Sequence, residues 1–201
     1  MPPRPSPASL EAVLDDAWAR LEGGLTRRHD PFHQGVLATI GLDGAPSARY
    51  VVVREVDRAA GMVGFHTDAR SAKPAELARA PRVSLCLFGE SVQLRLSGEA
   101  RVLRDGPAVD AAWARTGMLA RRCYLAEPAP GTDADMPLSG LPEAWVERPP
   151  GPAESEAGRV NFALVEITLD GVEWLHLAHA GHRRARFRRA GDGWVGRWCV
   201  P

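Results

Sequence analysis

From Gly35 to Leu103, apolar and polar residues alternate with a period of two, in short runs separated by turns rich in Gly and Asp. This alternation is typical of half-buried β-strands, and runs joined by tight turns predict consecutive antiparallel hairpins. A short helix over 71–80 interrupts them once. Because a closed sheet leaves no free edges, the pattern predicts an antiparallel β-barrel. The expected strands are residues 36–40, 48–56, 62–66, 82–88 and 92–103.

One amphipathic helix precedes these strands. Apolar residues recur at three- and four-residue spacing over 10–21, which predicts a helix with a buried stripe. Ser6 is its expected cap, Pro7 its expected first residue, and the Gly pair at 23–24 its expected end.

The second half of the chain is less regular. A helix is expected over 107–122, and Gly98 predicts a bulge or bend within its strand. Residues 127–156 carry seven acidic residues against Arg148 alone and few apolar ones, so they are expected to form a surface loop, either a lid or disordered. Residues 1–30 are thus expected to be a tail and helix, and 31–201 one domain. Its last expected strands are 160–169, 172–177, 184–189 and 194–200.

Charge and cysteine usage exclude several classes of protein. Lys and Arg total 25 and Asp and Glu total 25, and this balance argues against a general binder of nucleic acids or membrane surfaces. No apolar stretch is long enough for a signal peptide or a membrane span. The three cysteines are odd in number and far apart, which indicates reduced thiols. A cytoplasmic location is therefore expected.

Three groups of residues could carry chemistry. Two arginines bracket the segment Arg49–Arg54, a strand-to-helix junction runs from His66 to Lys73, and Gln93 stands in an apolar strand. A helix start offers free backbone N–H groups, and with the hydroxyls of Thr67 and Ser71 and the ammonium of Lys73, which is the only lysine, it suits a phosphate monoester.

Arg49 on a neighbouring strand could add a bidentate clamp. On a regular strand, however, Arg49 and Arg54 point to opposite faces. Both can serve one ligand only if the strand has a bulge, or if each serves the site of a different subunit.

Simpler interpretations stay open for each group. Arg49 and Arg54 could pair with acids such as Glu55 or Asp57, the residues of the junction could be a cap and a solvated first turn, and Gln93 could satisfy a backbone group.

Two patterns in the C-terminal region invite other interpretations. His176, His179 and His182 are spaced three apart, but this spacing alternates faces on a strand, so no metal site is expected. The basic run 183–189 could bind nucleic acid; we expect instead a hairpin whose arginines face the acidic 127–156 loop and a ligand edge.

In order and spacing, these motifs resemble the FMN-binding split barrels related to pyridoxamine 5′-phosphate oxidase. The likeness covers residues 32–105 well and 160–201 loosely. The matching residues are Leu37-Ala38-Thr39, Asp43-Gly44, Arg49–Arg54, Thr67-Asp68, Ser71–Lys73, Gln93, Arg186-Phe187, Trp194 and Pro201.

The resemblance implies a mainly-β, antiparallel Greek-key split barrel with peripheral helices. It further implies a homodimer with FMN in the clefts between subunits and a small-molecule substrate. Arg49, Ser71 and Lys73 would hold the FMN phosphate. The full set of implied cofactor-binding residues is Arg49, Val51, Val52, Arg54, His66, Thr67, Ser71, Lys73, Gln93 and Arg186.

The departures from this family concern the substrate. Arg54 stands where the oxidase usually has a lysine that holds the substrate phosphate, and only Arg115 matches the rest of that phosphate site. Ser71-Ala72-Lys73 also lacks one phosphate-binding arginine of the family's motif. The likeness is therefore to an uncharacterised branch rather than to the oxidase proper.

The expected function is that of an FMN-dependent oxidoreductase, with hydride transfer at flavin N5. No side chain stands out as an essential acid or base. The alternatives are a deazaflavin-dependent reductase of the same fold and a non-catalytic module that binds flavin or haem.

Overall fold

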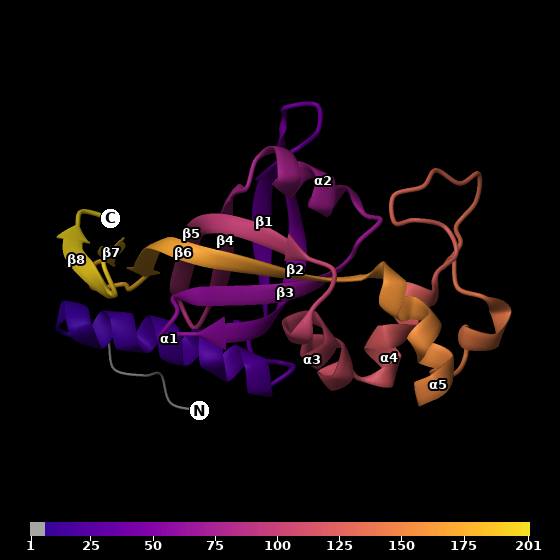
Figure 1. The fold of residues 1–201 in the computed structure, drawn as a ribbon. Coiled ribbons are helices and arrows are strands. Elements are labelled where there is room, and N and C mark those ends of the chain that lie inside the picture. The colour runs from indigo at the N-terminus through magenta and orange to yellow at the C-terminus, as the bar shows by residue number, and fades with distance from the viewer. Residues whose placement is uncertain (1–6) are drawn as a thin grey trace.

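The computed structural model describes residues 7–201, which form one antiparallel sheet and its peripheral helices. The strand order is β3-β2-β1-β4-β5-β6-β7-β8, and β3 also pairs with β6, so β1 to β6 close into a barrel and β7–β8 extend from it as a hairpin (Figure 1). The predicted antiparallel barrel is therefore confirmed. The strands are β1 (Gln34–Ile40), β2 (Pro46–Asp57), β3 (Met62–Asp68), β4 (Arg82–Gly89), β5 (Val92–Leu103), β6 (Phe162–His176), β7 (Arg183–Ala190) and β8 (Gly193–Cys199).

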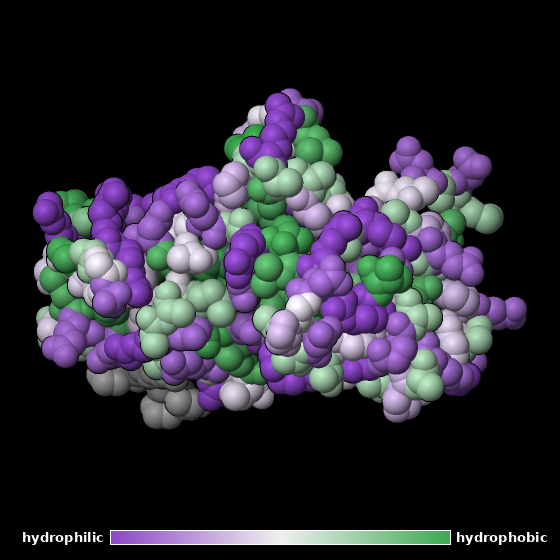
Figure 2. Space-filling view, in the orientation of Figure 1, coloured by the Kyte–Doolittle hydropathy of each residue, from purple (hydrophilic) through white to green (hydrophobic). Residues whose placement is uncertain are grey.

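The apolar and polar residues that alternate in the sequence alternate between buried and outward-facing positions on the strands. Along β5, Val92, Leu94 and Leu96 are almost fully buried, whereas the residues between them face outward. Inward residues of the other barrel strands join the same core. Polar residues cover much of the surface, and in the view of Figure 2 apolar residues gather over the centre of the barrel.

β6 is one continuous strand, so the prediction of separate strands over 160–169 and 172–177 was wrong. The sequence suggested a break at Asp170-Gly171. In the structure the irregularity lies in the pairing, because the register with β5 shifts between Ser97 and Gly98. The predicted irregularity at Gly98 is confirmed as this bulge. Pairing with both β5 and β3 supports β6 along its length.

Replacing Gly98 by Ala is expected to lower the free energy of unfolding by about 2 kcal/mol or more. An added Cβ would lie 2.1 Å from the backbone oxygen of Thr168, which cannot move without breaking sheet pairing. Gly117→Ala is the control, because a Cβ there meets nothing within 4 Å. Denaturant titration of both variants measures the difference, and equal stability would contradict the steric account.

α1 (Leu10–Thr26) begins and ends later than predicted. Ser9 is the N-cap and accepts a hydrogen bond from the Ala12 amide; Pro7 lies before the helix, and Ser6 lies outside the described residues. The glycine pair does not end the helix. A Cβ on Gly24 would lie 2.4 Å from the Phe32 carbonyl oxygen, so this glycine permits close packing of the following loop.

α1 packs on the barrel of its own chain and crosses β2, β7 and β8. Val13, Trp18 and Leu21 are buried in the barrel core. Arg20, itself buried, donates to Asp16, and the Trp174 indole of β6 donates to the same carboxylate at 2.9 Å. The helix is thus part of the core.

The helix expected over 107–122 is broken in two. α3 (Pro107–Arg115) ends at Thr116, and α4 (Met118–Arg121) is followed by the 3-10 turn η1 (Arg122–Leu125). The buried Arg121 guanidinium donates to the carbonyl oxygens of Trp113 and Thr116 and stacks on the Trp113 ring. These contacts satisfy carbonyl groups at the end of α3, which is why the break is stable.

The acidic 127–156 segment is mostly irregular and exposed, with two short helical turns. It holds the 3-10 turn η2 (Glu143–Trp145) and α5 (Pro152–Ser155), and the 3-10 helix η3 (Glu156–Asn161) then leads into β6. This segment and the β7–β8 hairpin lie at opposite ends of the molecule (Figure 1). The arginines of β7 therefore do not face the acidic loop of their own chain; Arg184 and Arg186 pair with Glu173 of β6.

Within residues 7–201, no helix is long and apolar enough to cross a membrane.

Candidate functional site

A cavity of about 660 Å³ lies between the β2–β3 hairpin and the segment from the end of α3 to η1. α2 (Ala72–Arg79) begins at one side of it. Its wall includes seven of the residues that the sequence singled out: Val51, Val52, Arg54, His66, Thr67, Lys73 and Arg115.

A β-bulge at Arg54 interrupts the regular alternation of side chains along β2. The register between β2 and β3 shifts between Val53 and Glu55, so Arg54 occupies a β-bulge. The bulge changes the direction of the following side chains, and every residue from Val51 to Glu55 contributes to the cavity wall. The bulge named in the sequence analysis is therefore present, although Arg54 lines the cavity and Arg49 does not.

The corner where β3 meets α2 concentrates positive charge. Lys73 is half-buried, and among the described residues its ammonium has no hydrogen bond or ion pair. Burial lowers the pKa of Lys73, the neighbouring Arg49 lowers it further, and Glu76 and Asp68 oppose this. Two adjacent cations, one unpaired and on a cavity wall, favour an anion at this corner.

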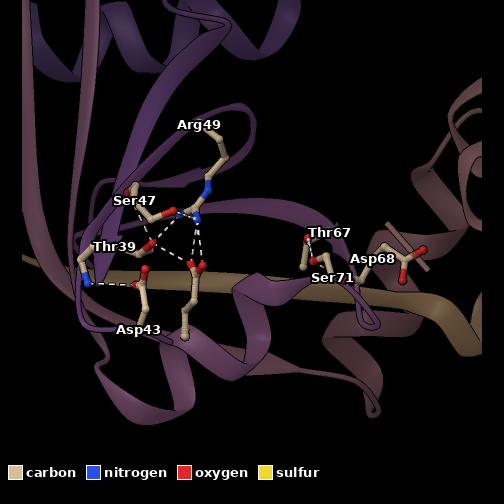
Figure 3. A network of polar contacts seen from close by, with 9 residues as sticks. Thr39, Asp43, Ser47, Arg49, Thr67, Asp68 and Ser71 are labelled. Atoms are coloured by element: carbon tan, nitrogen blue, oxygen red, sulfur yellow. Dashed lines mark hydrogen bonds and ion pairs between the residues drawn. The ribbon is translucent and has the colours of Figure 1, made fainter. Parts of the chain in front are cut away.

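Hydroxyl groups lie at the same corner (Figure 3). Thr67 and Ser71 are buried, and their oxygen atoms lie 3.3 Å apart. Ser71 occupies the N-cap position of α2, but its hydroxyl donates to the Asp68 carbonyl oxygen at 2.7 Å instead of capping the helix. Its remaining lone pair and the first amides of α2 leave polar groups for a ligand.

Arg49 lies behind this corner, in a network with β1 and α2 (Figure 3). Its Nη2 donates to both carboxylate oxygens of Glu76, at 2.8 and 3.0 Å, and to Ser47 Oγ at 2.7 Å; its Nη1 donates to Thr39 Oγ1. The partner acid is thus Glu76, not Glu55 or Asp57. The guanidinium edge best suited to a bidentate clamp is occupied.

His66 presents a neutral imidazole to the cavity. Burial lowers its pKa to about 4, and Arg54 and Arg115 add to the effect. Nδ1 lies 3.5 Å from Thr116 Oγ1, the ring packs edge-on against Phe162, and the buried Nε2 has no hydrogen-bond partner in the described chain. An orphaned nitrogen in a cavity wall is a site where a ligand could pair.

The lowered pKa of His66 predicts acid-sensitive stability. Between about pH 6.5 and 4 the unfolded chain binds a proton at His66 that the folded chain does not, so stability falls as the pH falls through this window. His66→Asn is expected to reduce that loss by up to about 3 kcal/mol. Urea titrations of both proteins at pH 7 and 4.5 measure the difference; parallel losses would contradict the prediction.

The outer part of the cavity holds the two arginines assigned to substrate. Arg115 Nη2 lies 2.9 Å from Glu55 Oε1, while Arg54 is exposed and makes no hydrogen bond to the rest of the described chain. Tyr124 and Thr116 also line this part, and sequence reasoning missed both. They reach the wall because the helix breaks after Arg115, a feature without a local sequence signal except Gly117.

Gln93 and Arg186 lie outside the cavity. Both belong to the outer face of the sheet, Gln93 on β5 and Arg186 on β7, where Arg186 donates to Glu173 at 2.9 Å. The same face carries the exposed Tyr50 and Phe88. Neither residue contributes to the cavity wall.

No group of three or more His, Cys, Asp or Glu residues that could hold a metal ion occurs in residues 7–201.

The closed barrel, its hairpin extension and the cavity beside β2 and β3 define a split-barrel protein. A family profile described as pyridoxamine 5′-phosphate oxidase matches residues 29–136, and the chain belongs to this family. A pyridoxine/pyridoxamine 5′-phosphate oxidase of Jannaschia sp. is 32% identical over 193 residues, 90% of each chain. A dihydrophenazinedicarboxylate synthase of Pseudomonas chlororaphis is 29% identical over 174 residues, 82% of this chain and 73% of that one.

Solved structures agree. A pyridoxamine 5′-phosphate oxidase-related, FMN-binding protein of Nostoc punctiforme matches with a TM-score of 0.73 and 25% identity, over 98% of this chain and 100% of the other.

Proposed function

We propose that the protein is an FMN-dependent oxidoreductase that acts on a small anionic substrate. The observation that carries the proposal is the half-buried, unpaired ammonium of Lys73 near Arg49, on the wall of a cavity that Thr67 also lines, with the Ser71 hydroxyl 3.3 Å from that of Thr67. A phosphate dianion would pair this ammonium and accept from the hydroxyls and the α2 amides. The residues present therefore fit the phosphate of FMN.

Each part of the wall has a role in this proposal. Lys73, Ser71 and Thr67 bind the phosphate, the backbone of Val51 and Val52 lines the flavin ring, and His66 offers a neutral hydrogen-bonding group. FMN, when bound, supplies a hydride acceptor at N5. The protein binds and orients both reactants, and the aromatic cluster behind the cavity excludes water from one side.

The anionic character of the substrate follows from Arg54 and Arg115. Arg54 has no partner in the described chain, and Arg115 would have to exchange Glu55 for a ligand anion. A phosphate or a carboxylate would satisfy them; one relative is named for oxidising a phosphate ester, and another for making a dicarboxylate. Because the family's substrate-phosphate residues are incomplete here, we expect slow turnover of pyridoxine and pyridoxamine 5′-phosphate.

We also propose a homodimer with one cofactor cleft on each side. The outer sheet face exposes Tyr50 and Phe88, and Tyr50 also lines the cavity, so the cavity continues onto this face. A second copy packed there would bring Gln93 and Arg186 of the partner subunit toward the ring. Within each subunit we propose one domain over residues 31–201, preceded by a tail and helix over residues 1–30.

Titration of the purified protein with FMN, followed by flavin fluorescence, tests the cofactor. Saturable binding supports the proposal, and a colourless protein that does not change the fluorescence overturns it. Competition between FMN and a deazaflavin tests the deazaflavin-dependent alternative, which predicts that the deazaflavin binds more tightly. Oxygen uptake with pyridoxamine 5′-phosphate and with a tetrahydrophenazine carboxylate then separates the substrate classes; tight FMN binding without any turnover would favour the non-catalytic module.

A further inference from the structure

Glu76 is a buried carboxylate with an unusual set of partners. It lies on α2, is 4% exposed, and sits behind the corner that holds Lys73. Its Oε2 accepts from Thr39 Oγ1 at 2.7 Å, and both of its oxygens accept from Arg49 Nη2. Burying a carboxylate costs desolvation free energy unless charged and hydrogen-bonding groups replace the lost water. Arg49 and Thr39 are such groups here.

The network fixes the long side chain of Arg49. Glu76, Thr39 and Ser47 take up three of its five N–H groups: both hydrogens of Nη2 and one of Nη1. Ordering a free arginine costs side-chain entropy, and in the folded chain the network has already ordered Arg49 before any ligand binds. Nε–H and one Nη1 hydrogen remain for a ligand.

Glu76 also influences Lys73. The two residues are three apart on α2, a spacing that places them on one side of the helix. Arg49, from β2, lowers the pKa of Lys73, whereas Glu76 and Asp68, at the end of β3, raise it. Glu76 therefore partly offsets the effect of Arg49 on the pKa of Lys73.

We propose that Glu76 is a positioning residue of the phosphate site: its hydrogen bonds hold the Arg49 side chain in place behind the β3–α2 corner, near Lys73. This inference rests on the proposed FMN site. It distinguishes Glu76 from a merely structural acid, because its effect should reach the phosphate end of the ligand and not the ring.

FMN and riboflavin differ only in the phosphate, so their affinities for wild type and Glu76→Gln test the proposal. We expect the variant to bind FMN about 3- to 10-fold more weakly, roughly the contribution of one uncharged hydrogen bond, with riboflavin affinity changed by less than about twofold. The pH at which FMN binding weakens on the alkaline side should also fall, because Lys73 loses a neighbouring carboxylate.

Two further variants complete the test. Glu99→Gln removes an exposed carboxylate outside the cavity wall and should leave both affinities unchanged. Thr39→Val removes the hydroxyl that links Glu76 to Arg49 without changing the side-chain shape, and should reproduce part of the FMN loss even if Glu76→Gln unfolds.

The outcomes separate this inference from the proposed function. If wild type prefers FMN to riboflavin and both Glu76→Gln and Thr39→Val keep that preference, the positioning role is overturned and the FMN site stands. Parallel losses of FMN and riboflavin affinity also overturn it. If wild type binds neither flavin, the proposed function fails and the inference fails with it.

Discussion

The Lys73→Met protein is expected to bind FMN at least tenfold, and up to about 150-fold, more weakly than wild type, while its affinity for riboflavin stays within about twofold. The ammonium is the one cation of the corner without a partner in the described chain, so it is free to give its full charge-assisted hydrogen bond to the phosphate. Methionine keeps the length and apolar packing of the side chain. Flavin fluorescence titration with both ligands measures the difference.

Arg101→Met is the matched control for this substitution. It also replaces a cation by methionine, but Arg101 lies on β5, is exposed and pairs with Glu166 away from the cavity. Its affinity for FMN should be that of wild type. If Lys73→Met binds FMN as tightly as Arg101→Met does, the phosphate does not lie at the β3–α2 corner.

The Phe88→Asp protein is expected to be monomeric at concentrations where wild type is a dimer, with dimer affinity lowered by about 100-fold or more. Phe88 is 57% exposed on β4, on the outer sheet face with Gln93 and Arg95, and a buried unpaired carboxylate would be costly there. Light scattering coupled to size exclusion reads the mass, which for a wild-type dimer is twice the 21.7 kDa of one chain.

Loss of the dimer should also weaken FMN binding, because Gln93 and Arg186 do not line the cavity of their own chain and are proposed to reach the ring from the partner subunit. Val160→Asp is the control, since Val160 is an exposed apolar residue outside the sheet. A monomeric wild type, or a Phe88→Asp protein that remains a dimer, would contradict the proposed interface.

Local patterns were sufficient to predict the barrel strands. The period-two runs up to residue 103 place β1 to β5 within a few residues of their observed bounds, because each hairpin is joined by a short turn whose residues are visible in the sequence. β6 was predicted as two strands, because its pairing with β5 and β7 at Gly171 comes from distant parts of the chain and is not encoded locally.

The candidate site was predictable in its residue types and less so in its geometry. The strand-to-helix junction and Lys73 follow from local sequence, and the structure places them in one wall with Arg54. The partner of Arg49 is 27 residues away on another element, so no local pattern indicates Glu76. Tyr124 lines the cavity because the helix breaks after Arg115, and the break is stabilised by a hydrogen bond from Arg121 to the Thr116 carbonyl oxygen.

A crystal structure of the protein with FMN tests the central claim most directly. The account predicts the phosphate at the junction of β3 and α2, with its oxygens about 3 Å from Lys73 Nζ and from the hydroxyl of Ser71 or Thr67, and the ring along residues 51–53. A flavin bound elsewhere with this corner filled by water, or a cavity that stays empty at saturating FMN, would contradict it.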